Sequence, residues 1–210
     1  MTERRGMFIT VEGGEGAGKS TNLAYIQQLL EESGVEVLFT REPGGTELGE
    51  EVRDLLLGHK HTGMGEDTEL LLMFGARAEH LKRKILPALE KGQWVLCDRF
   101  TDASYAYQGG GRGISWERIS ALESWVQGEL RPDLTLLLDL PVDQGLKRAG
   151  ERSEPDRFES EAQHFFDRVR SAYLRIAEQQ PARVRVIDAS LELDKVQAQI
   201  RSAVEEFLNR

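Results

Sequence analysis

Short apolar runs recur along the chain, and between them lie segments in which apolar residues are spaced as on one face of a helix. Most runs are near-continuous rather than strictly alternating, which is typical of parallel strands that are covered on both faces. The predicted strands span residues 7–11, 35–40, 94–97, 134–138 and 184–187.

Three helical stripes are distinct in the intervening segments, and we interpret them as core or interface positions. They are formed by Leu23, Ile26, Leu29 and Leu30, by Phe165, Phe166, Val169 and Tyr173, and by Leu193, Val196, Ile200, Val204 and Phe207. Because strands and helices alternate with short links, the pattern predicts an α/β fold, a doubly wound sheet of five parallel strands flanked by helices. We expect one domain over residues 1–210.

Charge and composition narrow the classes of protein. The formal net charge of −9 argues against broad binding to nucleic acid or to a membrane. No apolar run approaches the roughly 20 residues of a membrane span, and no signal-peptide core precedes the first strand. Cys97 is the single cysteine, so we expect a buried structural thiol and no intrachain disulfide. These features predict a cytoplasmic protein.

The first predicted strand leads into GGEGAGKS, residues 13–20, which matches G-x-x-x-x-G-K-[ST] between a strand and a helix. Glycines let successive backbone N–H groups turn inward around a polyphosphate, and the helix N-terminus adds partial positive charge. Lys19 would reach the β- and γ-phosphates, and the Ser20 hydroxyl would ligate Mg²⁺. The predicted ATP-binding residues are Gly13, Gly14, Glu15, Gly16, Ala17, Gly18, Lys19, Ser20 and Thr21.

A phosphate loop alone does not separate an ATPase, a GTPase switch and a kinase. The chain has no N-K-x-D tetrad for reading guanine, and its third predicted strand ends at Asp98, followed by Arg99. A carboxylate at that edge of a parallel sheet is placed to bind Mg²⁺ directly or through water. The arginine suggests a second anion nearby, although a strand-end ion pair would explain both residues equally well.

Further motifs follow in the order TREPGG, LLLMFGAR, CDRFTDASYAYQGGGRG, RPDLTLLLDLP and DRFE. With them the chain closely resembles, nearly end to end, the bacterial thymidylate kinases, which are P-loop nucleoside-monophosphate kinases. The resemblance implies a P-loop NTPase-type fold and the conversion of dTMP to dTDP with ATP and Mg²⁺, in dTTP biosynthesis. It also implies a homodimer whose partners are the small molecules ATP and dTMP.

The resemblance also implies roles for single residues. Glu15 would lie near the 3′-hydroxyl of the acceptor sugar, Arg99 would grip the acceptor 5′-phosphate, and Asp98 would associate with the metal. Tyr107 would fill the space beside C2′ and so exclude a ribose hydroxyl. The expected dTMP-binding residues are Glu15, Glu42, Pro43, Arg53, Met73, Phe74, Arg77, Arg99, Ser104, Tyr107 and Gln108.

One departure from the family pattern concerns the thymine base, whose edge Arg77 would hydrogen-bond. In many relatives the phenylalanine that stacks on thymine lies four residues before this arginine. That place is Met73 in this chain, and Phe74 lies three residues before. Either side chain could cover the base, and we favour Phe74 because a flat ring gains more from stacking.

The arginine-rich segment RAGERSEPDRFE, residues 148–159, is expected to form a mobile lid. Relatives with an acidic residue in the phosphate loop, such as Glu15, place catalytic basic residues in this lid. The expected catalytic residues are Lys19, Asp98, Arg99, Arg148, Arg152 and Arg157. Two alternatives stay open: a kinase of dUMP or of a deoxynucleoside, and a nucleotide-dependent switch that hydrolyses slowly. His59 and His61 lack further metal-binding partners in sequence and are interpreted as solvated.

Overall fold

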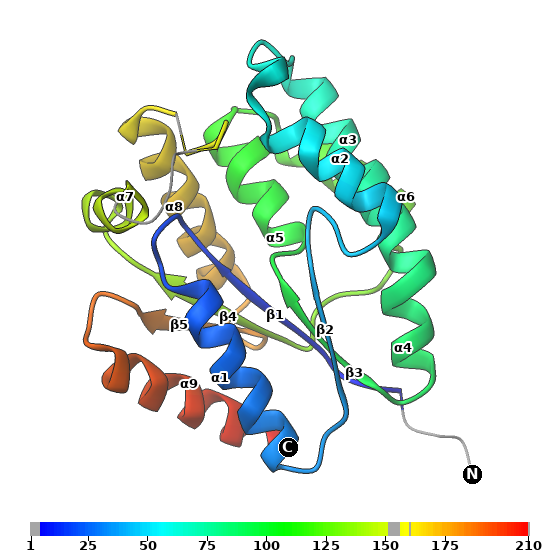
Figure 1. The fold of residues 1–210 in the computed structure, drawn as a ribbon, viewed down its shortest axis with the longest axis vertical. Coiled ribbons are helices and arrows are strands. Elements are labelled where there is room, and N and C mark those ends of the chain that lie inside the picture. The colour runs from blue at the N-terminus through cyan, green and yellow to red at the C-terminus, as the bar shows by residue number, and fades with distance from the viewer. Residues whose placement is uncertain (1–4, 151–155, 160, 210) are drawn as a thin grey trace.

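A single parallel sheet carries the fold, with its strands in the order β2–β3–β1–β4–β5 (Figure 1). The computed structural model describes residues 5–150, 156–159 and 161–209. The strands are β1 (Phe8–Gly13), β2 (Val37–Arg41), β3 (Trp94–Asp98), β4 (Leu134–Asp139) and β5 (Val184–Asp188). All five predicted strands are confirmed, and their ends shift by at most two residues.

Helices cover both faces of the sheet (Figure 1). They are α1 (Lys19–Glu32), α2 (Glu47–Leu57), α3 (Glu66–His80), α4 (Leu86–Glu90), α5 (Thr101–Ser104), α6 (Trp116–Gln127), α7 (Val142–Gly150), α8 (Gln163–Gln179) and α9 (Leu193–Leu208). A 3₁₀ turn, η1 (His59–His61), follows α2, and π-helical turns η2 (Leu81–Ile85) and η3 (Tyr105–Gly111) extend α3 and α5. α1 and α9 pack on one face, whereas α4, α5 and α8 pack on the other.

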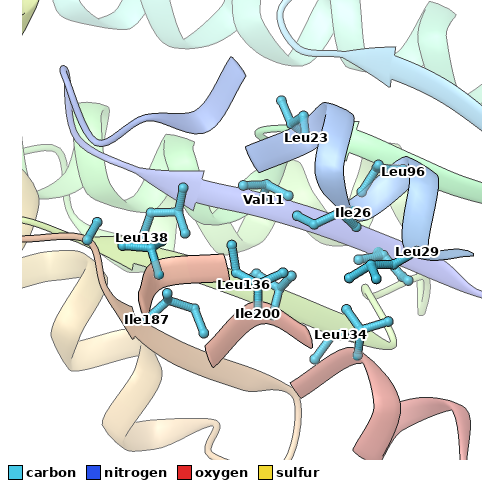
Figure 2. Packing of buried hydrophobic residues seen from close by; sticks show 14 of the residues in the cluster. Val11, Leu23, Ile26, Leu29, Leu96, Leu134, Leu136, Leu138, Ile187 and Ile200 are labelled. Carbon is cyan, nitrogen blue, oxygen red and sulfur yellow. The ribbon is translucent and has the colours of Figure 1, made fainter. Parts of the chain in front are cut away.

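The strands are apolar on both faces because both faces are covered. Leu136 and Leu138 of β4 face the layer of α1 and α9, whereas Leu137 between them packs against α8 (Figure 2). This arrangement explains why the sequence shows near-continuous apolar runs rather than alternation. The three predicted stripes lie on α1, α8 and α9, and they are largely buried, although Leu193 at the start of α9 is exposed.

The carboxyl ends of the central strands bring distant segments together. Asp98 at the end of β3 is in register with Val11 of β1 and with Arg41 of β2. The loops after β1, β2 and β3 therefore emerge at the same edge of the sheet. Because β1 lies between β3 and β4, the strand order reverses beside β1. Open α/β sheets bind their ligands at the carboxyl ends of the strands next to such a switch point.

Other expectations from the sequence concern single residues and the membrane. Cys97 is buried as predicted, and burial raises the pKa of its thiol. His59 and His61 in η1 are both exposed. Within residues 5–150, 156–159 and 161–209, no helix combines the length and the apolar character that crossing a membrane requires.

Candidate active site

A cavity of about 220 Å³ lies at the carboxyl edge of the sheet. It is bounded by the phosphate loop, the segments that follow β2 and β3, helix α3 and residues 156–159. Residues 15–20 line it together with Glu42, Pro43, Arg53, Met73, Arg77, Asp98, Arg99, Ser104, Tyr107 and Gln108. The fold therefore brings most of the expected donor and acceptor residues to one cavity.

The phosphate loop has the backbone that its glycines predict. Gly16 and Gly18 have φ angles of +67° and +81°, in the left-handed region that favours glycine. A Cβ atom on Gly16 would lie 2.0 Å from the carbonyl oxygen of Gly145, so α7 packs directly on the loop. A side chain at position 16 would therefore displace the backbone of α7.

Lys19 is folded onto this loop. Its Nζ donates hydrogen bonds to the carbonyl oxygens of Gly13 at 3.2 Å and Gly14 at 2.9 Å. Burial, together with the nearby charge of Arg99, lowers the pKa of the Lys19 ammonium. Three of the predicted ATP-binding residues do not line the main cavity: Gly13, Gly14 and the exposed Thr21. Gly13 and Gly14 contribute the carbonyl groups that accept from Lys19.

Arg99 crosses from β3 to the phosphate loop. Its guanidinium donates to the Gly13 carbonyl at 2.8 Å and to Glu15 Oε1 at 2.9 Å. The hydroxyl of Tyr107 donates to the same Glu15 oxygen at 2.6 Å, and the Arg99 guanidinium lies 4.9 Å from the centre of the Tyr107 ring. The expected acceptor residues Glu15, Arg99 and Tyr107 thus form one connected group.

Two further charged groups face the cavity beside Arg99. Asp98 has a buried Oδ1 atom that finds no hydrogen-bond partner in the part of the chain described. Arg53 donates to the Pro43 carbonyl at 3.0 Å, and burial together with the charge of Arg41 lowers the pKa of Arg53. A partly buried cation such as Arg53 gains from a bound anion. The unpartnered oxygen of Asp98 is suited to a hydrated cation.

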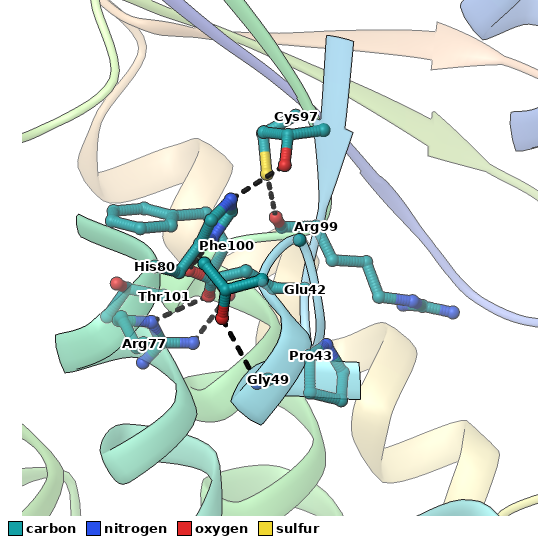
Figure 3. Close-up of polar contacts among 12 residues, drawn as sticks. Glu42, Pro43, Gly49, Arg77, His80, Cys97, Arg99, Phe100 and Thr101 are labelled. Carbon is teal, nitrogen blue, oxygen red and sulfur yellow. Dashed lines mark hydrogen bonds and ion pairs between the residues drawn. The ribbon is translucent and has the colours of Figure 1, made fainter. Parts of the chain in front are cut away.

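Arg77 is held at the base of the cavity by Glu42. Its Nε donates to Glu42 Oε2 at 2.7 Å, while His80 Nδ1 lies 3.0 Å from Glu42 Oε1 (Figure 3). Burial by itself would raise the pKa of Glu42, but Arg77 and His80 outweigh it and hold the pKa below its usual value. Arg77 Nη2 also donates to Ser104 Oγ at 3.1 Å.

One donor of Arg77 is left over. Its Nη1 is buried and, among the described residues, has no hydrogen-bond partner. Arg77 lines the cavity, and a buried donor without a partner is costly, which favours a ligand acceptor for this nitrogen. Gln108, also in the cavity lining, is tied back by a 2.9 Å hydrogen bond from its Nε2 to Glu69.

Phe74, the favoured cover of the base, lies outside the cavity lining. Phe74 is buried among Leu70, Ile114 and Ile119, and its ring lies 4.5 Å from the Arg77 guanidinium. Met73 lines the cavity instead. Both residues neighbour Arg77 on α3, since positions three and four residues apart lie on one helix face, but Phe74 is on the side that packs against Ile119 of α6 and Met73 is on the side of the cavity.

Arg157, an expected catalytic residue, also lies apart from the cavity lining. This side chain is buried away from the cavity lining, with Nη2 donating to Glu69 Oε2 at 2.7 Å and Nε donating to the Leu56 carbonyl at 2.6 Å. Arg148 is exposed at the end of α7 and donates to the Ala189 carbonyl at 3.1 Å. Arg152 lies outside the described residues.

Comparison with known proteins decides the family. A sequence model described as thymidylate kinase matches residues 11–200 of the chain. The chain belongs to the thymidylate kinase family. Similar relatives are the thymidylate kinases of Pseudomonas syringae pv. tomato, 60% identical over 203 residues and 97% of each chain, and of Pseudomonas entomophila, 60% identical over 205 residues and 98% of each chain.

A solved thymidylate kinase structure, from Ehrlichia chaffeensis, supports the same assignment. It matches with a TM-score of 0.77 at 35% sequence identity, and the match covers 96% of this chain and 99% of that one. The fold is therefore that of a P-loop NTPase, as the phosphate loop and the five parallel strands indicated.

Several residues of this thymidylate kinase site escaped the sequence analysis. The cavity is also lined by Leu57, Phe100, Ala103, Asp156, Phe158 and Glu159. The last three belong to DRFE, so that motif marks a wall of the cavity as well as the lid. Behind the cavity, Glu12 interrupts an apolar strand, and a carboxylate in such a place was a visible signal. Tyr173, on an apolar helical stripe, carried no such signal.

Proposed function

We propose that the chain transfers the γ-phosphoryl group of ATP to dTMP, giving dTDP for dTTP biosynthesis. The observation that carries this proposal is one cavity that joins a phosphate loop to a second pocket with its own cations, Arg53 and Arg99, and a spare donor on Arg77. A slow nucleotide-hydrolysing switch has no use for that second pocket. A kinase of neutral deoxynucleosides would need a base for the 5′-hydroxyl and would have less use for two arginines.

At the donor end, the backbone N–H groups of residues 13–20 and the N-terminus of α1 would hold the phosphates of ATP. Lys19 would exchange its bonds with the Gly13 and Gly14 carbonyls for phosphate oxygens. Its lowered pKa is consistent with this exchange, because an anion beside the buried ammonium favours the charged form.

Mg²⁺ would be held by Ser20 and Asp98. The donor set fits, because Mg²⁺ prefers oxygen ligands and keeps several waters, and Asp98 offers a buried oxygen without a partner among the residues described. When bound, the ion neutralises charge on the phosphates. Asp98 would orient the hydrated ion, and the Ser20 hydroxyl at the start of α1 would complete its protein ligands.

At the acceptor end, Arg99 and Arg53 would bind the 5′-phosphate of dTMP. Arg77 Nη1 would donate to a thymine carbonyl, which disfavours the amino group of cytosine. Tyr107 would exclude a ribose hydroxyl, and Glu15 would accept from the 3′-hydroxyl. Met73 covers the base in this arrangement, with Pro43, Ser104 and Gln108 completing the wall.

The transfer itself requires positioning and charge stabilisation more than acid–base chemistry, because the attacking phosphate is already anionic. Arg148 and Arg152 would supply positive charge from the lid, which would also exclude water. Arg148 is one helical turn beyond Gly145, which contacts the phosphate loop, and this supports its part in the proposal. Arg157 instead anchors the lid through Glu69.

We also propose a homodimer in the cytoplasm. Leu71 on α3 and Trp125 on α6 are 58% and 83% exposed, and these two helices pack against each other. Exposed large apolar side chains on neighbouring helices are typical of an association surface. Sedimentation velocity tests this: the wild-type protein should sediment as a dimer and Trp125→Glu as a monomer.

ADP release with ATP and Mg²⁺ tests the activity. The acceptors are dTMP, dUMP, the ribose form of TMP, dCMP, dGMP and thymidine, each added in turn. We expect near silence until dTMP is added and the fastest turnover with dTMP. Hydrolysis that does not depend on an acceptor would support a switch instead, and equal turnover with every acceptor would refute the thymidylate assignment.

A further inference from the structure

A buried pair lies behind Arg99, on the side away from the cavity. Glu12, near the end of β1, is fully buried, and Tyr173 of α8 is 3% exposed. The Tyr173 hydroxyl donates to Glu12 Oε2 at 2.8 Å, and it accepts from Arg99 Nη1 at 3.2 Å. Neither Glu12 nor Tyr173 is among the residues that line the main cavity, although Tyr173 lines a smaller neighbouring one with Gly14 and Glu15.

We propose that Glu12 and Tyr173 are positioning residues that set Arg99 for the acceptor phosphate. The inference rests on the proposed function, because the grip of Arg99 on that phosphate is part of it. It adds two residues to the acceptor site, and both act only through Arg99.

The backbone of Arg99 is the first point that Glu12 fixes. Arg99 has a φ of +66°, in the left-handed region that side chains other than glycine rarely adopt. The next N–H, that of Phe100, donates to Glu12 Oε1 at 2.6 Å, and the Arg99 N–H donates to the Val11 carbonyl at 3.0 Å. Both peptide groups flanking Arg99 are therefore tied to β1, which directs its side chain over that strand.

The Arg99 side chain is the second point. Its two Nη1 hydrogens are used by the Gly13 carbonyl at 2.8 Å and by Tyr173, whose hydroxyl is held by the other Glu12 oxygen. Glu15 uses one hydrogen of Nη2. These three hydrogen bonds fix the orientation of the guanidinium plane. Within the described structure, the donors that remain are Nε and one Nη2 hydrogen. A planar fork fixed in this way suits a phosphate, which it binds with two donors.

The hydrogen bonds of Glu12 act against its electrostatic surroundings. Burial, with the charge of Asp102, raises the pKa of Glu12 to about 8, although Arg99, Tyr173 and the Phe100 N–H oppose that rise. Glu12 is thus kept in an unfavourable place by specific bonds rather than by solvation. One Glu12 oxygen accepts from the Phe100 N–H and the other from the Tyr173 hydroxyl. A glutamine at this position can make a hydrogen bond to each of these groups, whereas a leucine can make neither.

Tyr173→Phe is the sharpest variant, because it removes one oxygen and leaves the ring that packs beside Tyr107. The measurement is the affinity for dTMP and for thymidine, by calorimetry without ATP. We expect dTMP binding to weaken about 3- to 10-fold, the size of one hydrogen-bond contribution, and thymidine binding to be unchanged. Thymidine lacks the 5′-phosphate, so only an effect through Arg99 produces this split. Equal weakening of both ligands, or no weakening of dTMP, overturns the proposal.

Tyr25→Phe is the matched control. Its hydroxyl accepts from Arg201 Nε at 3.1 Å between α1 and α9, so the variant loses an exposed tyrosine–arginine hydrogen bond on the opposite face of the sheet. We expect this variant to bind both ligands as the wild type does. Turnover of dTMP by the wild type is measured alongside, and its absence would refute the proposed function. If the wild type is active but Tyr173→Phe does not weaken dTMP binding relative to thymidine binding, only the positioning role is refuted.

Two further comparisons test whether both residues act through Arg99. In an Arg99→Met background, adding Tyr173→Phe should weaken dTMP binding no further, and additive losses would contradict the proposal. Glu12→Gln should keep most of the dTMP affinity, since glutamine can still accept from Phe100 and bond to Tyr173. A Glu12→Gln variant that loses thymidine and dTMP binding equally would assign Glu12 a purely structural role.

Discussion

Arg157 and Glu69, 88 residues apart in sequence, form a buried ion pair with Nη2 and Oε2 separated by 2.7 Å. Their side chains are 5% and 1% exposed. Glu69 also accepts from Gln108 and from Arg112, so one carboxylate of α3 joins the lid, the cavity wall and η3. The backbone N–H of Arg157 adds a 3.1 Å hydrogen bond to the Leu57 carbonyl at the end of α2.

Arg157→Ala should therefore destabilise the fold. We expect the free energy of unfolding to fall by about 2–3 kcal/mol, somewhat less than a buried pair usually costs, because Glu69 keeps Arg112. Urea denaturation measures the loss. Arg148→Ala is the contrasting variant, since this exposed side chain should change stability by less than about 0.5 kcal/mol while lowering kcat. If Arg157→Ala instead lowers kcat and leaves stability unaltered, Arg157 contacts the phosphoryl group after all.

Arg77→Gln should relax the choice of base. It removes the spare Nη1 donor, so we expect kcat/KM for dTMP to fall by about tenfold or more, with a much smaller loss for dCMP. The substitution also takes a partner from buried Glu42, which affects every acceptor alike. The ratio of kcat/KM for dTMP to that for dCMP separates the two effects. An unchanged ratio would rule out a base-reading role for Arg77.

Tyr107 provides a test of sugar selection. Tyr107→Phe keeps the bulk beside the sugar and loses only the hydroxyl that bonds Glu15, so it should still reject the ribose form of TMP. In the wild type we expect the preference for deoxyribose over ribose to be worth about 1–3 kcal/mol. Tyr107→Ala opens the space beside the sugar and should reduce this preference toward zero. The measurement is kcat/KM for both sugars. Equal rejection by Tyr107→Ala would show that bulk is not the cause.

The raised pKa of Glu12 predicts a dependence of stability on pH. Because burial beside Asp102 raises the folded-state pKa to about 8, the folded protein binds a proton that the unfolded chain releases near pH 4.5. This contribution to stability is complete below pH 4.5 and is lost as the pH rises towards 8. The free energy of unfolding of the wild type should thus fall relative to Glu12→Gln between pH 5 and 8, by at most about 1.4 kcal/mol per pH unit. Urea unfolding at several pH values measures the difference, and a flat difference would contradict it.

The sequence predicted what depends on local pattern. The strands follow from contiguous apolar runs, and the phosphate loop follows from glycines at fixed spacing between a strand and a helix. Residues that act through distant partners could not be predicted in this way. Arg157 looks like a mobile lid arginine until Glu69 is found beside it, and Tyr173 looks like a core residue until its hydroxyl meets Glu12 161 positions away.

Helix phase set a further limit. Met73 and Phe74 are adjacent, and their family counterparts did not decide which one faces the base. In the structure Phe74 packs at the contact between α3 and α6, beside Arg77, and Met73 lines the cavity. Such a choice depends on packing around the whole helix rather than on the spacing of two residues.

The burial of Cys97 has a practical consequence for following motion. The chain has this one thiol, and its position inside the sheet together with its raised pKa makes it a poor target for alkylating reagents. The native sequence is therefore already a suitable background for site-directed labelling. Cysteines introduced at the exposed positions Lys60 and Lys147 would accept a donor and acceptor dye pair, and energy transfer between the dyes would report the distance between η1 and the end of α7 as nucleotides bind.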